Sequence, residues 1–512
     1  MLIKQAPWIN GKALQTLFVL YLLSNLLLLL NINGLYWDDW VLYHQSFDEM
    51  KDMMNQLTGN AHVFEYLHHA LSQIGNGVFP YRLLTTIVYF LSGLFLYYIL
   101  SDIKSLSRKS GFYITLLFIV LPVNSARVAL CDVQYGLFLC VFFMAFWLLT
   151  RYVNQIDRSI FFRAAILGLF FLSFFVSSLL VFYAIVILYL FYESNRQATK
   201  VLVHYADFIC LPVLFYCIKS IYYVPYGLYS HYNAISTDYL VVMLNLAQAV
   251  KMAFYKPLVQ AFAVSQQFLF LLCVTMAFLF LYLREEPVES QQKKPIILMA
   301  LGILFFMLAV FPYVAVGKIP ALDHFDSRHM LLIPLGLSFF LYSIILFMER
   351  LNRAFAHIAL ITLLSACILK NMHDQTQYLK DWFYQVALEE HYKDNPIIND
   401  NTTFLFKSNI AFANHRSMQF YEHNGRLKKV FGDDTRFMGD NVSELQTYAS
   451  YKNYPRYNFS TWTPSTPVTV IIQKSENHDL TQKPFLTLLI SMLHNDTKFR
   501  REVKKLITMD VA

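Results

Sequence analysis

The chain has 512 residues, of which 57% are hydrophobic and only 15% are charged. A soluble globular protein carries about 25% charged residues, so this chain has too few charges to cover a surface that faces water. Its net charge of +7 is not gathered into a basic stripe with interleaved aromatic residues, because lysines and arginines stand in short clusters between apolar runs. This composition excludes a soluble protein, argues against a nucleic-acid partner and indicates an integral membrane protein.

The first apolar run, 13–32, is too long for the apolar region of a signal peptide, and no small-residue cleavage site follows it. We therefore expect a retained first membrane span. The run 161–192 is too long for one untilted helix, and Ser177 and Ser178 at its middle predict a tight helical hairpin. Single spans are expected at about 81–100, 112–130, 135–150, 202–221, 263–283, 296–316, 329–348 and 354–370.

These runs give about eleven transmembrane helices, and the positive-inside rule orients them. With the hairpin counted as two helices, most short basic loops fall on the side of the N-terminus, with the cations Lys104, Arg108, Lys109, Arg151, Arg158, Arg163, Arg196, Lys200, Arg284, Lys293, Lys294, Arg350 and Arg353. The N-terminus is therefore expected in the cytoplasm and the C-terminal segment outside it. The compact loops favour a bacterial inner membrane.

Three outside segments, 34–80, 222–262 and 371–512, are longer than linkers require. Within the second, 238–258 has apolar residues at helical spacing with two lysines, which predicts a helix lying in the membrane interface. The third opens with an amphipathic stretch, 371–392, which continues the last helix. It then carries β-rich runs at 402–407 and 468–474 and a helix at about 482–507. The predicted fold is an all-α membrane bundle, 1–370, followed by a small α/β domain, 371–512.

The sequence Trp37-Asp38-Asp39-Trp40 stands directly after the first span and includes two adjacent carboxylates. In one interpretation the tryptophans are interfacial anchors and the aspartates are solvated loop residues. However, two aspartates beside an anionic lipid surface gain nothing electrostatically. A carboxylate at this position is suited to act as a general base on a hydroxyl or amine that arrives from the aqueous side. Asp38 and Asp39 are therefore the catalytic candidates.

The rest of the first outside loop is rich in titratable groups, among which His62, Glu65 and His69 have a spacing that places them near one helical face. Imidazole and carboxylate side chains there are suited to a divalent metal ion. The same pattern is equally typical of a polar cavity wall or a solvated face, and it matches no zinc signature. His62 and Glu65 are therefore supporting candidates, no metal ligand is assigned, and a divalent cation is left open as a cofactor.

Two groups of cations stand at the outer ends of the spans. Arg82 begins the second span and Arg127 ends the third, where each is either a side chain reaching to the interface or a fork for two phosphate oxygens. The segment 318–329 crowds six ionisable groups before another span. Its Arg328 and His329 are candidates for binding a lipid-linked phosphate, with Asp323 and Asp326 orienting them, against the alternative of a structural ion-pair network.

The aspartate pair after the first span, the short inside loops and the long first outside loop resemble the GT-C glycosyltransferase superfamily. At residue level the resemblance covers mainly 36–40 and, more weakly, Arg82, Arg127 and 326–329. Oligosaccharyltransferases of that superfamily carry a Trp-Trp-Asp motif in the tail. Here the only tryptophan after residue 400 is Trp462, which stands between two threonines. The resemblance therefore does not extend to N-glycosylation.

The resemblance implies that Asp38 or Asp39 is the catalytic carboxylate and that the donor is a polyprenyl-phosphate-linked sugar. It implies transfer to a glycan, lipid or protein acceptor outside the cytoplasm by inverting displacement, while cations offset charge on the leaving phosphate. The absence of a Gly-rich phosphate loop agrees with a donor that is not a nucleotide sugar. The alternatives are a glycolipid transporter or flippase, although no internal repeat typical of transporters is found, and a silent scaffold whose tail binds partners.

Overall fold

The computed structural model describes residues 11–43, 45–75, 77–154, 159–230, 233–236, 238–283, 295–322, 324–410, 418–441, 445–475, 480 and 482–512. The chain divides into two compact units. The membrane unit contains the chain up to Leu30 together with Arg82–Arg127 and Asp132–Asp374. The second unit, here called the outer unit, contains Asn31–Tyr81, Val128–Cys131 and Gln375–Ala512.

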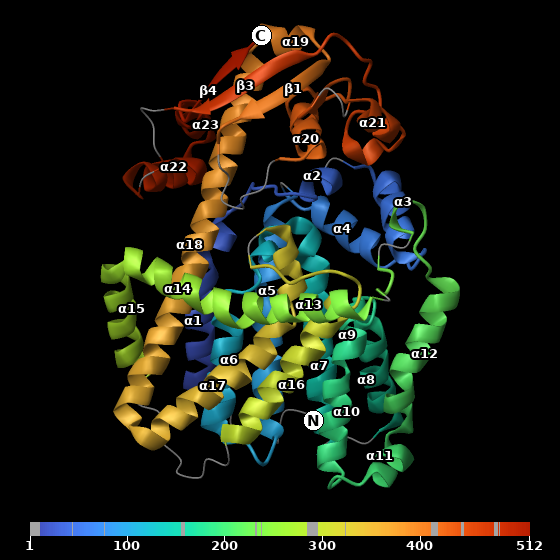
Figure 1. The fold of residues 1–512 in the computed structure, drawn as a ribbon, viewed down its shortest axis with the longest axis vertical. Helices are drawn as coiled ribbons and strands as arrows, with labels where there is room; N and C mark the ends of the chain where they lie inside the picture. The colour runs from blue at the N-terminus through green and yellow to red at the C-terminus, as the bar shows by residue number, and fades with distance from the viewer. Residues whose placement is uncertain are drawn as a thin grey trace. The chain divides into compact units, whose positions relative to one another are not determined.

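Within the described residues, six helices are long and apolar enough to cross a bilayer, and eight spans result if two bent helix pairs are each counted once. The chain is therefore an integral membrane protein. The six helices are α1 (Gly11–Leu30), α5 (Phe79–Asp102), α7 (Val133–Val153), α16 (Pro295–Val314), α17 (Ile333–Leu351) and α18 (Arg353–Asp394). Figure 1 shows the fold with these labels.

The remaining helices of the membrane unit are shorter, so the predicted number of about eleven separate spans exceeds what their lengths support. They are α6 (Arg108–Val120), α8 (Ile160–Ser173), α9 (Ser177–Phe182), α10 (Ala184–Glu193), α11 (Ala198–His204), α12 (Ala206–Tyr222), α13 (Tyr239–Val250), α14 (Lys256–Gln267) and α15 (Leu269–Tyr282). A π-helical turn, Lys251–Tyr255, joins α13 to α14.

The prediction of a span over 112–130 was wrong in its second half. Helix α6 ends at Val120, and Leu121 has the extended dihedral angles φ −60° and ψ 128°. Pro122 follows, and a proline disfavours helical geometry in the residue before it. The chain then forms two 3₁₀ turns, η1 (Ser125–Val128) and η2 (Leu130–Asp132), before α7 begins. This early ending creates the turn that carries Arg127.

The predicted break in the run 161–192 is present, because α8 ends at Ser173 and α9 begins at Ser177. The segment predicted to lie in the interface is also distinctive. Helices α13 and α14 form one element that meets α15 at an angle of 107°. It runs across α16 and α17 rather than along them, as Figure 1 shows. This direction agrees with a helix that lies in the membrane interface.

Two glycines bring α16 and α17 into close contact. A Cβ atom added to Gly302 would lie 2.6 Å from the backbone nitrogen of Phe340. A Cβ atom added to Gly336 would clash with the backbone nitrogen of Phe306 in return. Small residues at helix crossings let backbones approach within a membrane, where packing rather than water exclusion drives association. The two helices are the ones that precede and follow the turn carrying Arg328.

The outer unit contains a four-stranded sheet in the order β2-β1-β3-β4. Strands β2 (Phe437–Gly439), β1 (Thr403–Ser408) and β3 (Val468–Lys474) are parallel, and β4 (Ile507–Val511) is antiparallel to β3. Its helices are α2 (Asp39–Leu42), α3 (Phe47–Thr58), α4 (Phe64–Ser72), α19 (Pro396–Asp400), α20 (Phe420–Phe431), α21 (Leu445–Ala449), α22 (Gln482–His494) and α23 (Asp496–Lys504).

The tail predictions hold in part. The two β-rich runs form strands β1 and β3, and 371–392 continues the last helix as α18, which reaches Asp394. The helix predicted over 482–507 is two helices and the start of strand β4, because Asn495 interrupts it as the N-cap of α23. The first outside loop, assigned by sequence to the 1–370 domain, belongs to the same compact unit as the tail.

Candidate functional site

The Trp37-Asp38-Asp39-Trp40 turn is part of the packed interior of the outer unit. Both indoles are buried, with exposed fractions of 1% and 0%. Trp37 has φ +51° and packs edge-on against the ring of Tyr378. The interpretation of these tryptophans as interfacial anchors is therefore wrong, since neither ring is available to a membrane surface.

Asp39 is the buried member of the aspartate pair. Its side chain is fully buried, and its carboxylate accepts three backbone N–H groups. Oδ2 accepts from Tyr36 at 3.0 Å, and Oδ1 accepts from Leu130 at 2.6 Å and from Cys131 at 3.1 Å. A buried carboxylate is stable when such donors satisfy its oxygens. Asp39 therefore ties the turn to the segment 128–131 and has no oxygen directed at solvent.

Asp38 has the opposite surroundings, because its side chain is partly exposed. Oδ1 accepts a hydrogen bond of 3.0 Å from the phenol hydroxyl of Tyr421, which belongs to α20. In the described part of the chain, no other side-chain hydrogen bond to Asp38 is found. One oxygen is thus held in place, and the other is left to accept a proton or hydroxyl group from a ligand. Of the two predicted catalytic carboxylates, Asp38 is therefore the one with an oxygen open to a ligand.

The outer unit also fixes the turn from its far side. The guanidinium of the fully buried Arg426 lies 5.0 Å from the Trp40 ring centroid. A Cβ atom added to Gly425 would lie 3.0 Å from the same ring. Asn458 donates its amide to the backbone carbonyl of Trp40 at 3.0 Å. Because these contacts come from the tail, the position of Asp38 depends on residues far along the chain.

The two supporting candidates of the first outside loop form a pair. His62 Nδ1 lies 2.8 Å from Glu65 Oε1, and Glu65 is fully buried. His69 instead packs on Phe47 with ring centroids 4.6 Å apart, so the predicted three-residue face does not assemble. His62 also precedes α4 with φ +49°. Among the described residues, no group of three or more potential metal ligands is found.

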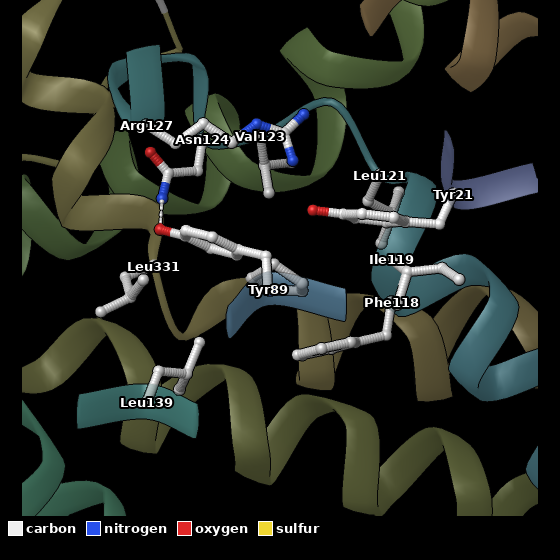
Figure 2. A pocket seen from close by; sticks show the side chains of 11 residues that line it. Tyr21, Tyr89, Phe118, Ile119, Leu121, Val123, Asn124, Arg127, Leu139 and Leu331 are labelled. Atoms are coloured by element: carbon white, nitrogen blue, oxygen red, sulfur yellow. Dashed lines mark hydrogen bonds between the residues drawn. The ribbon is translucent and has the colours of Figure 1, made fainter. Parts of the chain in front are cut away.

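In the membrane unit, Arg127 lines a small cavity of about 30 Å³. Its guanidinium donates to the side-chain oxygen of Asn371 at 2.9 Å. The Asn371 amide in turn donates to Ser24 at 2.9 Å and to the carbonyl of Val120 at 2.7 Å. Figure 2 shows the guanidinium and the Tyr21 hydroxyl on the same side of this cavity. Asn371 thus fixes the orientation of Arg127 and is itself held by α1 and α6, while Arg127 remains partly exposed.

The structure brings Arg127 and Arg328 onto neighbouring turns. Arg328 belongs to η5 (Phe325–Met330), which is hydrogen-bonded to η1. The Ser327 hydroxyl accepts from the backbone of Ala126 at 2.7 Å and lies 3.0 Å from the Ser125 hydroxyl. The Arg328 guanidinium lies 3.6 Å from the Phe325 ring centroid. Two segments about 200 residues apart therefore place their arginines at one end of the membrane unit.

The ionisable groups around Arg328 differ in their charge. Asp326 lies 4.0 Å from both Arg328 and His329, a distance at which exposed charges interact weakly. Burial, followed by the nearby charges of Arg328 and Lys318, lowers the pKa of His329 to about 3, so His329 is neutral near pH 7. Burial and the charge of Arg328 also lower the pKa of Lys318, to about 8. Asp323 lies outside the described residues.

Arg82, the remaining predicted phosphate ligand, is fully buried. It stands in the first turn of α5 and is not accessible to a ligand in this structure. The sequence did not predict two residues that orient predicted site residues. Tyr421 donates a hydrogen bond to Asp38, and Asn371 accepts one from Arg127. Neither residue lies in a motif, and each is more than 240 residues away in the sequence from its hydrogen-bond partner. No local signal would have identified them.

Comparisons with known proteins place few limits on the chain. No family model matches it, and no curated protein does. One similar solved structure is that of ArnT from Cupriavidus metallidurans bound to undecaprenyl phosphate. The match covers 94% of each chain with 10% sequence identity and a TM-score of 0.38. Values this low do not establish a common function, so the residues of this chain have to carry the functional assignment.

Proposed function

We propose that the protein is a membrane glycosyltransferase that moves a sugar from a polyprenyl-phosphate donor to an acceptor outside the cytoplasm. The observation that carries this proposal is the environment of Asp38. Asp38 is a partly exposed carboxylate with one oxygen fixed by Tyr421. The neighbouring Asp39 is buried and accepts hydrogen bonds from backbone N–H groups. This arrangement gives one oriented base rather than a pair of solvated charges.

The transfer is a direct displacement at the anomeric carbon. The acceptor oxygen attacks this carbon, and the bond from the carbon to the phosphate oxygen breaks, with its electron pair remaining on the phosphate. The proton of the acceptor hydroxyl passes to Asp38. The products are the glycosylated acceptor and a polyprenyl phosphate. Because attack and departure take place on opposite faces, the anomeric configuration inverts.

The departing phosphate gains negative charge, and fixed cations stabilise that charge. Arg127 and Arg328 are the two proposed ligands, since both are partly exposed and lie on hydrogen-bonded turns. Lys318 adds a third positive charge below about pH 8. His329 is neutral and donates its single ring N–H to the backbone carbonyl of Ile319, so it adds no charge at this position. This departs from the sequence expectation that His329 serves as a cation.

The topology belongs to the same proposal. The distribution of lysine and arginine among the short loops supports a cytoplasmic N-terminus and an extracytoplasmic C-terminal domain, and we place the protein in a bacterial inner membrane. Nucleotide sugars are normally unavailable outside the cytoplasm, so a lipid-linked donor agrees with this orientation. Membrane lipid and the acceptor are the remaining partners.

The test combines a chemical and a cellular measurement. Wild-type protein, extracted in native lipid, is expected to carry a polyprenyl phosphate that mass spectrometry detects. Arg127→Ala is expected to lower its amount, while Lys109→Ala, which removes a cation paired with Glu349, should not. Cells carrying Asp38→Asn should lose a glycoconjugate that wild-type cells make. Unchanged glycoconjugates together with retained lipid would refute the transferase and favour a lipid transporter.

The mechanism assigns acceptor activation to Asp38 and phosphate stabilisation to Arg127. Asp38→Asn and Arg127→Lys are each expected to reduce transfer, and wild-type transfer by either variant would contradict the role proposed for its residue.

A further inference from the structure

Three segments far apart in the sequence meet at Asp38 within the outer unit. The turn 37–40 supplies the carboxylate, and α20 supplies Tyr421, whose hydroxyl donates to Oδ1 at 3.0 Å. The 3₁₀ turn η8 (Pro455–Tyr457) is fixed beside them, because Asn458 donates to the backbone carbonyl of Trp40 at 3.0 Å. The tail therefore surrounds the candidate base with its own side chains.

Two partly exposed aromatic rings border the carboxylate. The rings of Tyr421 and Tyr457 have centroids 6.3 Å apart and are tilted by 37°. Burial raises the pKa of Tyr457, and the negative charge of Asp38 adds a smaller contribution in the same direction. Phe420 packs against both tyrosines, with centroid distances of 5.6 Å and 5.2 Å. The two rings thus form a surface next to the carboxylate, here called the tyrosine platform.

The tyrosine platform is rigidly supported from behind. Phe420 and Tyr457 pack onto a buried aromatic cluster that consists of Phe437, Phe459 and Trp462. Arg456, with only 7% of its surface exposed, lies 5.0 Å from the ring centroid of Tyr457. Aromatic pairs of this kind add stabilisation beyond their buried area, and a cation over a ring adds more. The rings are therefore preorganised rather than free to turn.

The combination of a carboxylate with two ring faces selects its ligand by charge and shape. A cation is attracted to both groups, but Arg456 already lies over Tyr457 and would repel it. An anion is repelled by Asp38. A neutral ring with one apolar C–H face and hydroxyl groups at its edge fits both parts. Its C–H groups pack on the aromatic rings, and a hydroxyl donates to the free oxygen of Asp38.

We propose that the tyrosine platform and Asp38 form the acceptor subsite, and that the acceptor group bound there is a neutral pyranose ring. This inference rests on the proposed function and deepens it, because it narrows the acceptor to a carbohydrate. The tail domain then contributes directly to the catalytic site. Tyr421 has two separable roles: its ring binds the acceptor, and its hydroxyl positions the carboxylate.

Binding can be measured without turnover. The full-length protein is placed in lipid nanodiscs, since maltoside detergents carry the same chemistry as the probe. Methyl β-glucopyranoside is the probe and glycerol is the control polyol without a ring. Saturation-transfer NMR is expected to show transfer to the ring C–H protons of the glycoside and little to glycerol. Tyr421→Ala and Tyr457→Ala should each weaken binding of the glycoside by about threefold to tenfold.

Three further variants separate the roles. Tyr421→Phe keeps the ring, so this variant should still bind the glycoside. Its rate of transfer, measured in cells or membranes, should be lower because the hydroxyl that positions Asp38 is lost. Tyr66→Ala, which removes an exposed tyrosine that contacts Phe47, is the matched control and should bind as wild type does. Asp38→Asn should keep most of the stacking contact. Melting temperatures within a few degrees of wild type confirm that the variants are folded. If Tyr457→Ala does not fold, the binding measured for Tyr421→Ala decides the result.

Equal signals from wild type and Tyr421→Ala, or equal signals from the glycoside and glycerol, would overturn the subsite. The proposed function fails separately. If Asp38→Asn abolishes a cellular glycoconjugate while the platform variants bind and transfer normally, the transferase stands and the platform is wrong. If the platform variants lose binding while Asp38→Asn leaves glycoconjugates unchanged, the carbohydrate site stands and the transferase is wrong.

Discussion

The two adjacent aspartates are expected to respond in opposite ways to the same substitution. Asp39→Asn replaces a carboxylate that accepts three backbone N–H groups with an amide whose single oxygen cannot serve all of them. At least one buried N–H group loses its acceptor, which costs about 1–3 kcal/mol, and the remaining bonds lose their charge assistance. The expected loss is therefore about 3 kcal/mol in the free energy of unfolding of the outer unit.

Asp38→Asn removes no buried contact, since the amide oxygen of the introduced asparagine would still accept from Tyr421. The expected change in stability is below about 0.5 kcal/mol, which is typical of a surface substitution. Transfer activity, by contrast, should fall by about 10²–10⁴-fold, which is the usual contribution of a general base.

The assay is thermal unfolding in nanodiscs, followed by intrinsic tryptophan fluorescence, alongside the transfer measurement on the same samples. For a unit of about 190 residues, about 3 kcal/mol corresponds to a melting temperature lowered by roughly 6–12 °C. If Asp39→Asn melted with wild-type stability and abolished transfer, while Asp38→Asn remained active, the assignment of base and structural aspartate would be reversed and the reasoning refuted.

Three other predictions can be tested with single variants. Gly425→Ala places a methyl group 3.0 Å from the ring of Trp40, so it should displace the turn that carries Asp38 and reduce transfer. Gly336→Ala inserts a methyl group into the crossing of α16 and α17 and should destabilise the membrane unit by about 1–3 kcal/mol, measured as a lowered melting temperature. Gly168→Ala, at a position with no atom within 4 Å, is the control for both and should behave as wild type does. Lys318 has a pKa of about 8 and is charged below it, so binding of polyprenyl phosphate should weaken as pH rises from 7 to 9. Lys318→Arg should remove the pH dependence of binding, because arginine stays charged over this range. If the Lys318→Arg variant still bound more weakly at pH 9, ionisation of Lys318 would not be the cause.

Much of the membrane architecture follows from the sequence, because a lipid environment allows few solutions. Long apolar runs must be helical to satisfy their backbone groups, and the helices α1, α5, α16 and α17 lie close to their predicted ranges. The errors have two causes, a local helix-ending signal in one place and the absence of any local signal in another. Pro122 ends α6 ten residues before the predicted end of the span. Strand β2 has only three residues, too few to show an alternating pattern.

The sequence singles out the aspartate pair and the arginines at the helix ends, but it does not predict their surroundings. Asp38 and Asp39 are indistinguishable in the sequence, and their surroundings differ because the backbone N–H of Leu130 donates to Asp39 whereas the hydroxyl of Tyr421 donates to Asp38. Likewise, Arg82 and Arg127 both stand at helix ends. Arg82 is fully buried, whereas Arg127 is partly exposed and oriented by a hydrogen bond to Asn371, 244 residues away in the sequence. Such differences depend on long-range contacts, which periodicity and local motifs do not report.

These contacts also suggest why the tail and the first outside loop belong to one compact unit. In the proposed mechanism, Asp38 accepts a proton and then releases it in each cycle, which requires a fixed position and one open oxygen. A four-residue turn after a membrane helix supplies neither by itself. Asp39 fixes the turn from within, Arg426 and Asn458 hold Trp40 from the tail, and Tyr421 occupies one oxygen of Asp38. The tail is thus the part of the chain that converts an exposed carboxylate into an oriented one.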